Sequence, residues 1–152
     1  MKKIHSTGIK ILLKKGQSKM IKWGIIGAGN IAKRFIGSLK NSDKGELYAI
    51  ASYTKANRDY YVENHPGVKV YDNYISLLED KDIDAVYVAT RHNDHYPWVK
   101  EAIKHKKAVL CEKPATLYYH QTKELCDLAK ENNVFFLEGM KTRFVPLIEF
   151  EG

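Results

Sequence analysis

A glycine-rich turn between a short apolar run and the start of a helix is the feature that most constrains the fold. Residues 22 to 35 read KWGIIGAGNIAKRF, and Gly27, Gly29 and Ala32 fit the pattern G-x-G-x-x-[GA]. The first glycine permits a tight turn, the second lets the backbone approach a pyrophosphate, and the small third residue lets helix and strand touch. Because the same string also fits an ordinary tight loop, the rest of the chain has to decide between the two.

The remainder of the chain alternates strand and helix patterns, which is typical of a doubly wound sheet. The apolar run at 84–90 is continuous rather than alternating, as expected for a parallel strand covered on both faces. Strands are predicted at 21–26, 47–52, 68–71, 84–90, 108–112 and 134–139. Helices are predicted at 31–40, 55–65, 74–80, 96–105 (with Pro97 in the first turn) and 122–133. We therefore predict an α/β Rossmann fold with a doubly wound parallel sheet of about six strands.

The net charge of +7 is concentrated at the beginning of the chain. Residues 1–19 contain six lysines and no acidic residue. The rest of the chain therefore contains 19 of the 25 basic residues and all 18 acidic ones. The apolar stretch in this segment is too interrupted for a signal peptide, so a disordered or non-native basic leader is expected. A membrane-surface or polyanion-binding arm is the alternative. The nearly neutral remainder gives no reason to expect a nucleic-acid partner.

Two further compositional features bear on the location of the protein. No run of about 18 apolar residues exists, so no membrane span is predicted. Cys111 and Cys126 lie too far apart in the sequence for a C-x-x-C site. They are interpreted as reduced thiols in a cytoplasmic protein.

In a parallel sheet of this kind, ligands bind at the carboxyl ends of the strands. This rule selects residues 52–55, 90–95 and 112–114. Lys113 could hydrogen-bond a substrate oxygen and stabilise developing alkoxide charge, or it could be a solvated loop lysine. His92 and His95 resemble half of a metal site, but no third ligand follows at a suitable spacing, so no metal is predicted.

The end of the second predicted strand bears on the choice of cofactor. An NAD site of this architecture usually has Asp or Glu about 20 residues past the glycines. This chain instead has ASYTKANR at 51–58, with hydroxyl groups at Ser52, Tyr53 and Thr54 and no carboxylate. Lys55 and Arg58 could bind a 2′-phosphate, or they could point into solvent. We predict a preference for NADP(H), with NAD(H) possible.

Four segments, in this order and spacing, resemble the nucleotide-binding half of the Gfo/Idh/MocA oxidoreductases, the glucose-fructose oxidoreductase and inositol dehydrogenase family. They are GIIGAGNIAKRF, DAVYVATRHNDHYPWVKEAI, AVLCEKPAT and FFLEGMKTRFVP. The E-K-P triplet at 112–114 is the most specific of these elements, and EGMKTRFVP resembles the dihydrodiol-dehydrogenase-like branch. The resemblance covers residues from 20 to about 150 and leaves the basic leader outside it.

The resemblance implies hydride transfer between a nicotinamide cofactor and an alcohol carbon of a sugar, polyol or diol. The lysine of E-K-P is catalytic in the family, which implies that role for Lys113. The loop after the fourth strand borders the nicotinamide, and Arg91 stands where many relatives carry Pro. The predicted cofactor-binding set is Gly27, Gly29, Asn30, Ile31, Ser52, Tyr53, Lys55, Arg58, Thr90, Arg91, His92, His95, Glu112, Lys113 and Arg143.

Family members continue into a second domain that binds substrate, through a helix that here begins near Val145. We expect residues 20–144 to form the NAD(P)-binding domain and residues 145–152 to begin the linker, with the substrate domain absent from this chain. The isolated chain is then expected to be inactive, and its apolar residues 144–150 to favour a homo-oligomer. The alternatives are a nucleotide-binding module or truncated remnant without turnover, and a methyltransferase with a similar glycine turn.

Overall fold

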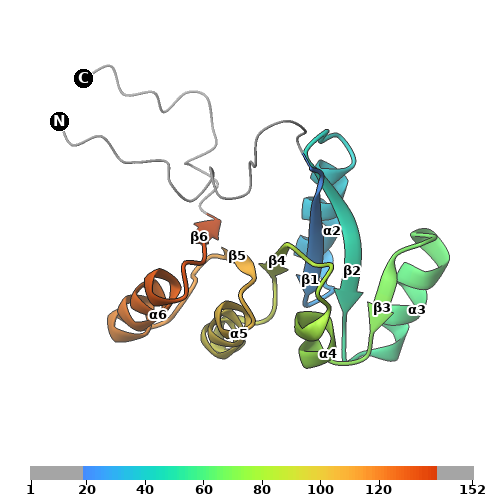
Figure 1. Cartoon of the computed structure of the whole chain (residues 1–152). Helices are drawn as coiled ribbons and strands as arrows, with labels where there is room; N and C mark the ends of the chain where they lie inside the picture. Colours follow the sequence, from blue (N-terminus) through green and yellow to red (C-terminus); the bar gives the residue numbers. More distant parts are fainter. Residues whose placement is uncertain (1–18, 140–152) are drawn as a thin grey trace, which may run out of the picture.

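The computed structural model describes residues 19–139, which form a six-stranded sheet with helices on both faces (Figure 1). The strands are β1 (Ile21–Ile26), β2 (Gly45–Ala51), β3 (Lys69–Tyr71), β4 (Ala85–Val88), β5 (Ala108–Glu112) and β6 (Phe136–Gly139). The helices are α2 (Asn30–Leu39), α3 (Lys55–Asn64), α4 (Tyr74–Glu79), α5 (His92–Lys104) and α6 (Tyr119–Glu131).

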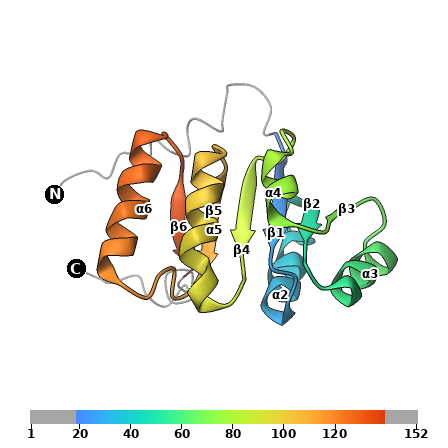
Figure 2. The ribbon, with the colours of Figure 1, turned by 90° about the horizontal axis from the view of Figure 1, so that it is seen from below.

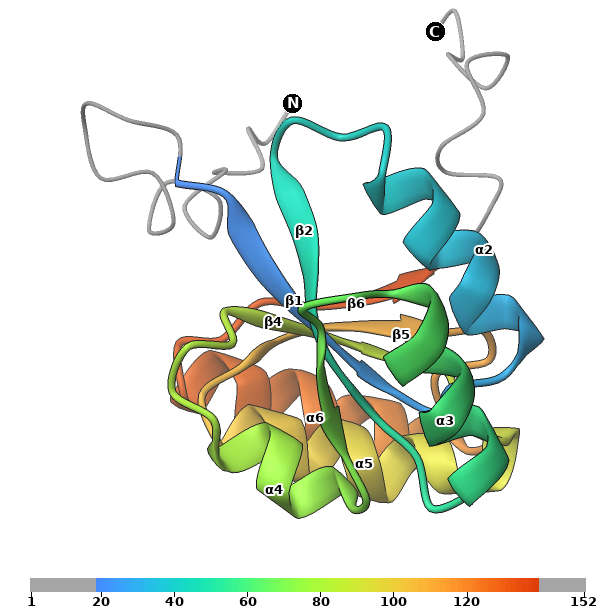
Figure 3. The ribbon, with the colours of Figure 1, turned by 90° about the vertical axis from the view of Figure 1, so that its right-hand side faces the viewer.

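The strands are all parallel and follow the order β3-β2-β1-β4-β5-β6. The direction in which successive strands are added reverses between β1 and β4, and such a switch point is where α/β sheets bind ligands. Helices α4, α5 and α6 cover one face of the sheet, and α2 and α3 cover the other (Figure 3). Figure 2 shows α4, α5 and α6 side by side over their face.

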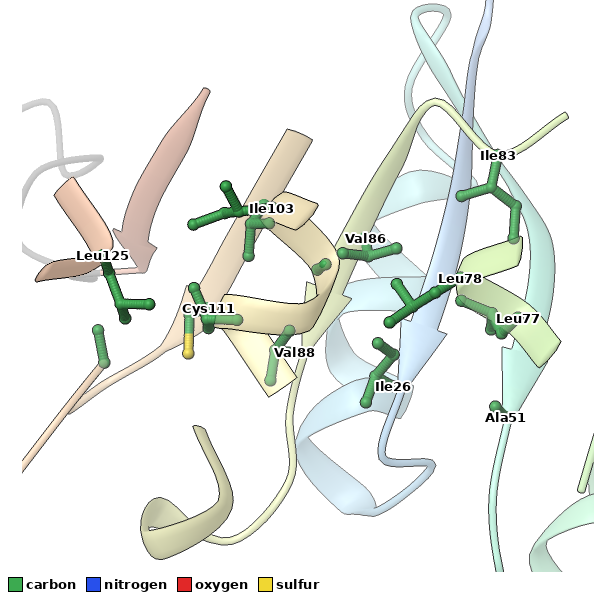
Figure 4. Packing of buried hydrophobic residues seen from close by; sticks show 14 of the residues in the cluster. Ile26, Ala51, Leu77, Leu78, Ile83, Val86, Val88, Ile103, Cys111 and Leu125 are labelled. Atoms are coloured by element: carbon green, nitrogen blue, oxygen red, sulfur yellow. The ribbon is translucent and has the colours of Figure 1, made fainter. Parts of the chain in front are cut away.

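Both faces of the central strands are buried. Neighbouring residues on a strand point to opposite sides of the sheet, so they pack into two different clusters. Ile25 packs on the side of α2 and α3, whereas Ile26 packs with Val86 and Val88 on the side of α4, α5 and α6. Burial of one such side chain contributes roughly 1.5 to 3 kcal/mol, so the two clusters hold the helices to the sheet. Figure 4 shows the larger cluster, which also contains Leu77, Leu78, Ile103, Cys111 and Leu125.

The predicted fold class is confirmed, and the differences lie at strand bounds and helix starts. β2 begins two residues before its predicted start, β4 ends two residues before its predicted end, and β6 begins two residues after its predicted start. The helix expected at 96–105 begins at His92, so Pro97 lies in its second turn instead of its first. Apolar periodicity begins only near Tyr96, and the preceding turn carries polar residues that give no such signal. Asp94 in that first turn interacts favourably with the helix dipole. Likewise, α6 begins at Tyr119, three residues before the predicted start.

Several predictions concern residues outside 19–139. They are the basic leader before Lys19, the linker at 145–152, the apolar stretch 144–150 and the cofactor contact of Arg143. Within the described range, none of the helices is long and apolar enough to cross a membrane.

Candidate cofactor-binding site

The glycine turn joins β1 to α2 and lies against the end of β4. Gly27 has a φ of +91°, a backbone conformation that residues with a Cβ rarely adopt. A Cβ at this position would lie 2.7 Å from the carbonyl oxygen of Ala89 and 2.8 Å from the amide nitrogen of Thr90. The fold itself therefore requires glycine at position 27.

Gly29, in contrast, is not required by the fold. Its φ is −82°, which any residue adopts, and a Cβ there would meet no atom of the described residues within 4 Å. Gly29 is also the N-cap of α2, and no side chain among residues 19–139 caps the free N–H groups of that helix. An open approach to uncapped N–H groups at a helix start fits a phosphate group.

A cleft of about 570 Å³ lies beside this turn at the carboxyl ends of β1, β2 and β4. It brings together six predicted residues, namely Gly27, Gly29, Ser52, Tyr53, Thr90 and Arg91. Thr54 and Asp94, from the ranges 52–55 and 90–95 selected at the strand ends, also line it. The lining residues that the sequence did not predict are Ala28, Asn57, Tyr74, Ala89 and Trp98. A second cavity of similar volume is lined by Ala108, Phe136 and Ala129, near the amino ends of β5 and β6. Parallel sheets bind ligands at the carboxyl edge, so the cleft beside the turn is the candidate cofactor site.

The end of β2 carries a hydrogen-bonded cluster around Ser52, which is buried. The Ser52 hydroxyl oxygen accepts the N–H of Thr54 at 3.2 Å and the side-chain amide of Asn57 at 3.4 Å. The Arg58 guanidinium donates to the Ser52 carbonyl oxygen at 2.7 Å. The side chain of Arg58 is therefore held at the carboxyl end of β2.

Lys55, the other predicted cation, forms an ion pair within its own helix. The Lys55 ammonium pairs with the Asp59 carboxylate at 2.6 Å along the exposed surface of α3. Arg58, not Lys55, is thus the cation that the structure holds at the strand end.

Aromatic rings form one wall of the cleft. The ring centroids of Tyr53 and Tyr74 are 4.6 Å apart, and those of Tyr74 and Trp98 are 4.8 Å apart. Burial, together with Tyr53 beside it, raises the pKa of Tyr74, so its hydroxyl stays neutral at physiological pH. Tyr74 and Trp98 come from helices α4 and α5, and no local motif links them to the glycine turn.

Several predicted residues lie near this cleft without lining it. Asn30 and Ile31 are exposed in the first turn of α2, next to Gly29. His92 is exposed at the start of α5, whereas His95 is fully buried, with its ring centroid 5.6 Å from that of His92. Within residues 19–139, no group of three or more His, Cys, Asp or Glu side chains could hold a metal ion.

Glu112 is the last residue of β5, the strand next to β4, and Lys113 follows it. The Glu112 carboxylate accepts a hydrogen bond from the Tyr87 hydroxyl and another, at 3.3 Å, from the backbone N–H of Lys113. Burial and the bond to Glu112 raise the pKa of Tyr87, which keeps this phenol neutral. The Lys113 side chain is exposed, and none of the described acidic side chains pairs with it. Lys113 is therefore available to a ligand at the carboxyl edge of the sheet.

Comparison with known proteins points in the same direction. Residues 21–140 match the model of the Gfo/Idh/MocA oxidoreductase family, NAD-binding Rossmann fold. The chain is 35% identical to trans-1,2-dihydrobenzene-1,2-diol dehydrogenase of Xenopus tropicalis over 130 residues, which cover 84% of this chain and 39% of that protein. It is 33% identical to D-xylose 1-dehydrogenase (NADP(+)) of Hypocrea jecorina over 144 residues, covering 87% of this chain and 37% of that protein.

A solved structure of similar fold is KijD10, a 3-ketoreductase from Actinomadura kijaniata in complex with NADP. Its TM-score is 0.75 at 33% identity, and the match covers 79% of this chain and 38% of that one. The chain therefore spans about two fifths of the length of the relatives that it matches.

Proposed function

The chain belongs to the Gfo/Idh/MocA oxidoreductase family, and from this membership we propose that residues 20–144 bind NADP(H) in the cleft beside Gly29. The proposed reaction is hydride transfer between the nicotinamide and an alcohol carbon of a sugar, polyol or diol. The observation that carries the proposal is Gly29, where the missing side chain leaves the uncapped start of α2 open at the switch point of the sheet. When bound, the nicotinamide supplies the hydride acceptor or donor.

The residues of the chain bind and orient the two reactants in this proposal. The N–H groups at the start of α2 receive the pyrophosphate, and Thr90 and Arg91 border the cleft toward β5. The exposed Lys113 ammonium donates a hydrogen bond to the substrate oxygen and stabilises the negative charge that develops on it. Orientation of the substrate beside the nicotinamide provides a large share of such catalysis.

The end of β2 supports a preference for NADP(H). Residues 51–58 contain no carboxylate that would repel a 2′-phosphate. The Ser52 hydroxyl acts as acceptor in both of its hydrogen bonds, so its own proton can be donated to the phosphate. Arg58 adds a cation at the same strand end. One charged hydrogen bond contributes about 1.5 to 3 kcal/mol, which corresponds to roughly a tenfold to hundredfold preference.

We also propose a location and partners for the protein. Cys111 and Cys126 are both free thiols, which fits a reducing compartment, and we place the protein in the cytoplasm. The substrate is a small molecule in this proposal, and a homo-oligomer is the expected assembly.

Calorimetric titration of the full chain with NADP(H) and with NAD(H) tests the proposal. We expect NADP(H) to bind about tenfold to hundredfold more tightly, and Arg58→Ala to remove most of that difference. Lys55→Ala is the matched control, because its ammonium pairs with Asp59 on the helix surface. Equal affinity for both cofactors, unchanged in Arg58→Ala, would contradict the proposed preference. Absence of binding to either cofactor would contradict the proposed function itself.

A further inference from the structure

The turn that carries Lys113 is held by polar contacts to three consecutive residues of its backbone. The N–H of Lys113 donates to the Glu112 carboxylate at 3.3 Å, and the N–H of Ala115 donates to the Glu138 carboxylate at 2.7 Å. Between them, the Pro114 carbonyl oxygen lies 2.7 Å from Nδ1 of His95. The three contacts come from β5, β6 and α5, so three separate elements fix this one turn.

These contacts reach the turn from both faces of the sheet. Glu112 bonds to Tyr87, which packs with the cluster on the side of α2. Glu138 in β6 lies opposite Cys111 in the register of β5 and β6. Cys111 and Ala115 belong to the cluster on the side of α5 and α6. The turn is therefore held between two supports, and its backbone has little room to shift toward either face.

His95 also connects this turn to the wall of the cleft. Its imidazole is fully buried on α5, and Nε2 lies 3.0 Å from the carbonyl oxygen of Thr90. Carbonyl oxygens only accept hydrogen bonds, so a neutral ring donates to one of the two loops and an imidazolium donates to both. The Thr90 loop and the Pro114 turn thus both contact one buried ring, and at least one of them is hydrogen-bonded to it.

We propose that His95 and Glu138 are positioning residues that hold the Lys113 ammonium in place relative to the Thr90 loop and the cofactor beside it. This inference rests on the proposed function, because it assumes that the cofactor occupies the cleft. Neither residue lines the cleft, so Glu138 acts through the backbone of the Lys113 turn, and His95 acts through that turn and the Thr90 loop.

The first measurement does not involve the cofactor. Amide hydrogen exchange at Ala115 is followed by NMR in the full chain and in Glu138→Ala and Glu138→Gln. Exchange is expected to accelerate by about tenfold or more in Glu138→Ala, because its charged acceptor is lost. Glu138→Gln keeps a carbonyl acceptor of the same length and is expected to restore most of the protection. Unchanged exchange at Ala115 in Glu138→Ala would overturn the proposal, whether or not the chain binds NADPH.

The second measurement concerns Lys113 itself. The rate of reductive methylation of Lys113 is measured by mass spectrometry with and without saturating NADPH. We expect NADPH to protect Lys113 in the wild-type chain and in Glu138→Gln. In Glu138→Ala, protection is expected to disappear although calorimetry shows NADPH still bound, which a merely structural role would not produce. Retained protection in Glu138→Ala would overturn the proposal, whereas failure of the wild-type chain to bind NADPH would contradict the proposed function.

The histidine is tested against a second histidine at the other end of α5. His95→Gln is compared with His105→Gln, since the ring of His105, the C-cap of α5, contacts the Glu101 carbonyl oxygen within its own helix at 2.8 Å. We expect weaker NADPH binding and loss of Lys113 protection in His95→Gln alone, because His95 holds both loops. Equal behaviour of the two variants would remove His95 from the proposal.

Discussion

Replacing each glycine of the turn by alanine separates what the fold requires from what the cofactor requires. In Gly27→Ala the new methyl group would lie 2.7 Å from the Ala89 carbonyl oxygen and 2.8 Å from the Thr90 nitrogen. The φ of +91° adds a conformational cost of about 1 to 2 kcal/mol for a residue with a Cβ. The overlap is with backbone atoms, which no rotamer change can relieve, so we expect a total loss of roughly 3 kcal/mol or more.

Gly29→Ala is expected to have the opposite profile. Its φ of −82° suits alanine, and its Cβ would meet none of the described atoms within 4 Å. Because alanine is a somewhat poorer N-cap than glycine, we expect a stability change within about 1 kcal/mol. The methyl group would, however, stand where the pyrophosphate approaches the start of α2, and NADP(H) affinity is expected to fall by about tenfold or more.

Urea unfolding followed by circular dichroism measures the first effect, and calorimetric titration with NADPH measures the second. The expected result is a loss of stability in Gly27→Ala and a loss of binding alone in Gly29→Ala. Wild-type affinity in a folded Gly29→Ala variant would refute the placement of the pyrophosphate beside Gly29. Wild-type stability in Gly27→Ala would refute the left-handed conformation of the turn.

Three further predictions concern stability. The buried Lys107 ammonium donates to two carbonyl oxygens after α4 at 2.6 and 2.9 Å, so Lys107→Met is expected to cost about 2 kcal/mol in urea unfolding. Leu125→Ala empties a fully buried position between α6 and the sheet and should cost about 2 to 5 kcal/mol, measured as a lower Tm. Burial alone would raise the pKa of Asp80, but hydrogen bonds from Tyr71 and Lys69 outweigh it and lower the pKa to about 2. Its stabilising effect is then complete above about pH 4 and is lost as the pH falls toward 2, and Asp80→Asn should flatten this acid limb of the stability curve.

The centre of the sheet could be predicted from the sequence because its central strands are buried on both faces. A strand such as β4 has no polar face, so Ala85–Val88 forms an uninterrupted apolar run that marks its own position. Helix starts carry a weaker signal. At α6 the first residues, Tyr119 and His120, are exposed and contribute nothing to an apolar period, so the helix was predicted to begin too late.

The site could be predicted only where its parts are local. The glycine turn is recognisable because Gly27 and Gly29 lie within one short string, whereas the aromatic wall of the cleft comes from two distant helices. The choice between the two cations at the end of β2 had a local signal, however. Asp59 stands four residues after Lys55, the spacing of an ion pair on a helix surface, and the structure forms that pair. Arg58 has no such partner in its own helix and turns back to the strand end.

His95 shows why buried polar residues are the hardest to interpret from sequence. Its three-residue spacing from His92 resembled half of a metal site, because side-chain patterns are what a sequence displays. Its actual partners are the carbonyl oxygens of Thr90 and Pro114, and any residue at those positions would supply the same oxygens. A contact to a backbone carbonyl oxygen leaves no pattern in the sequence, so only the three-dimensional path of the backbone reveals it. In this fold that path brings the loop after β4 and the turn after β5 to one buried ring, and this shared contact is the basis on which we propose His95 as a positioning residue.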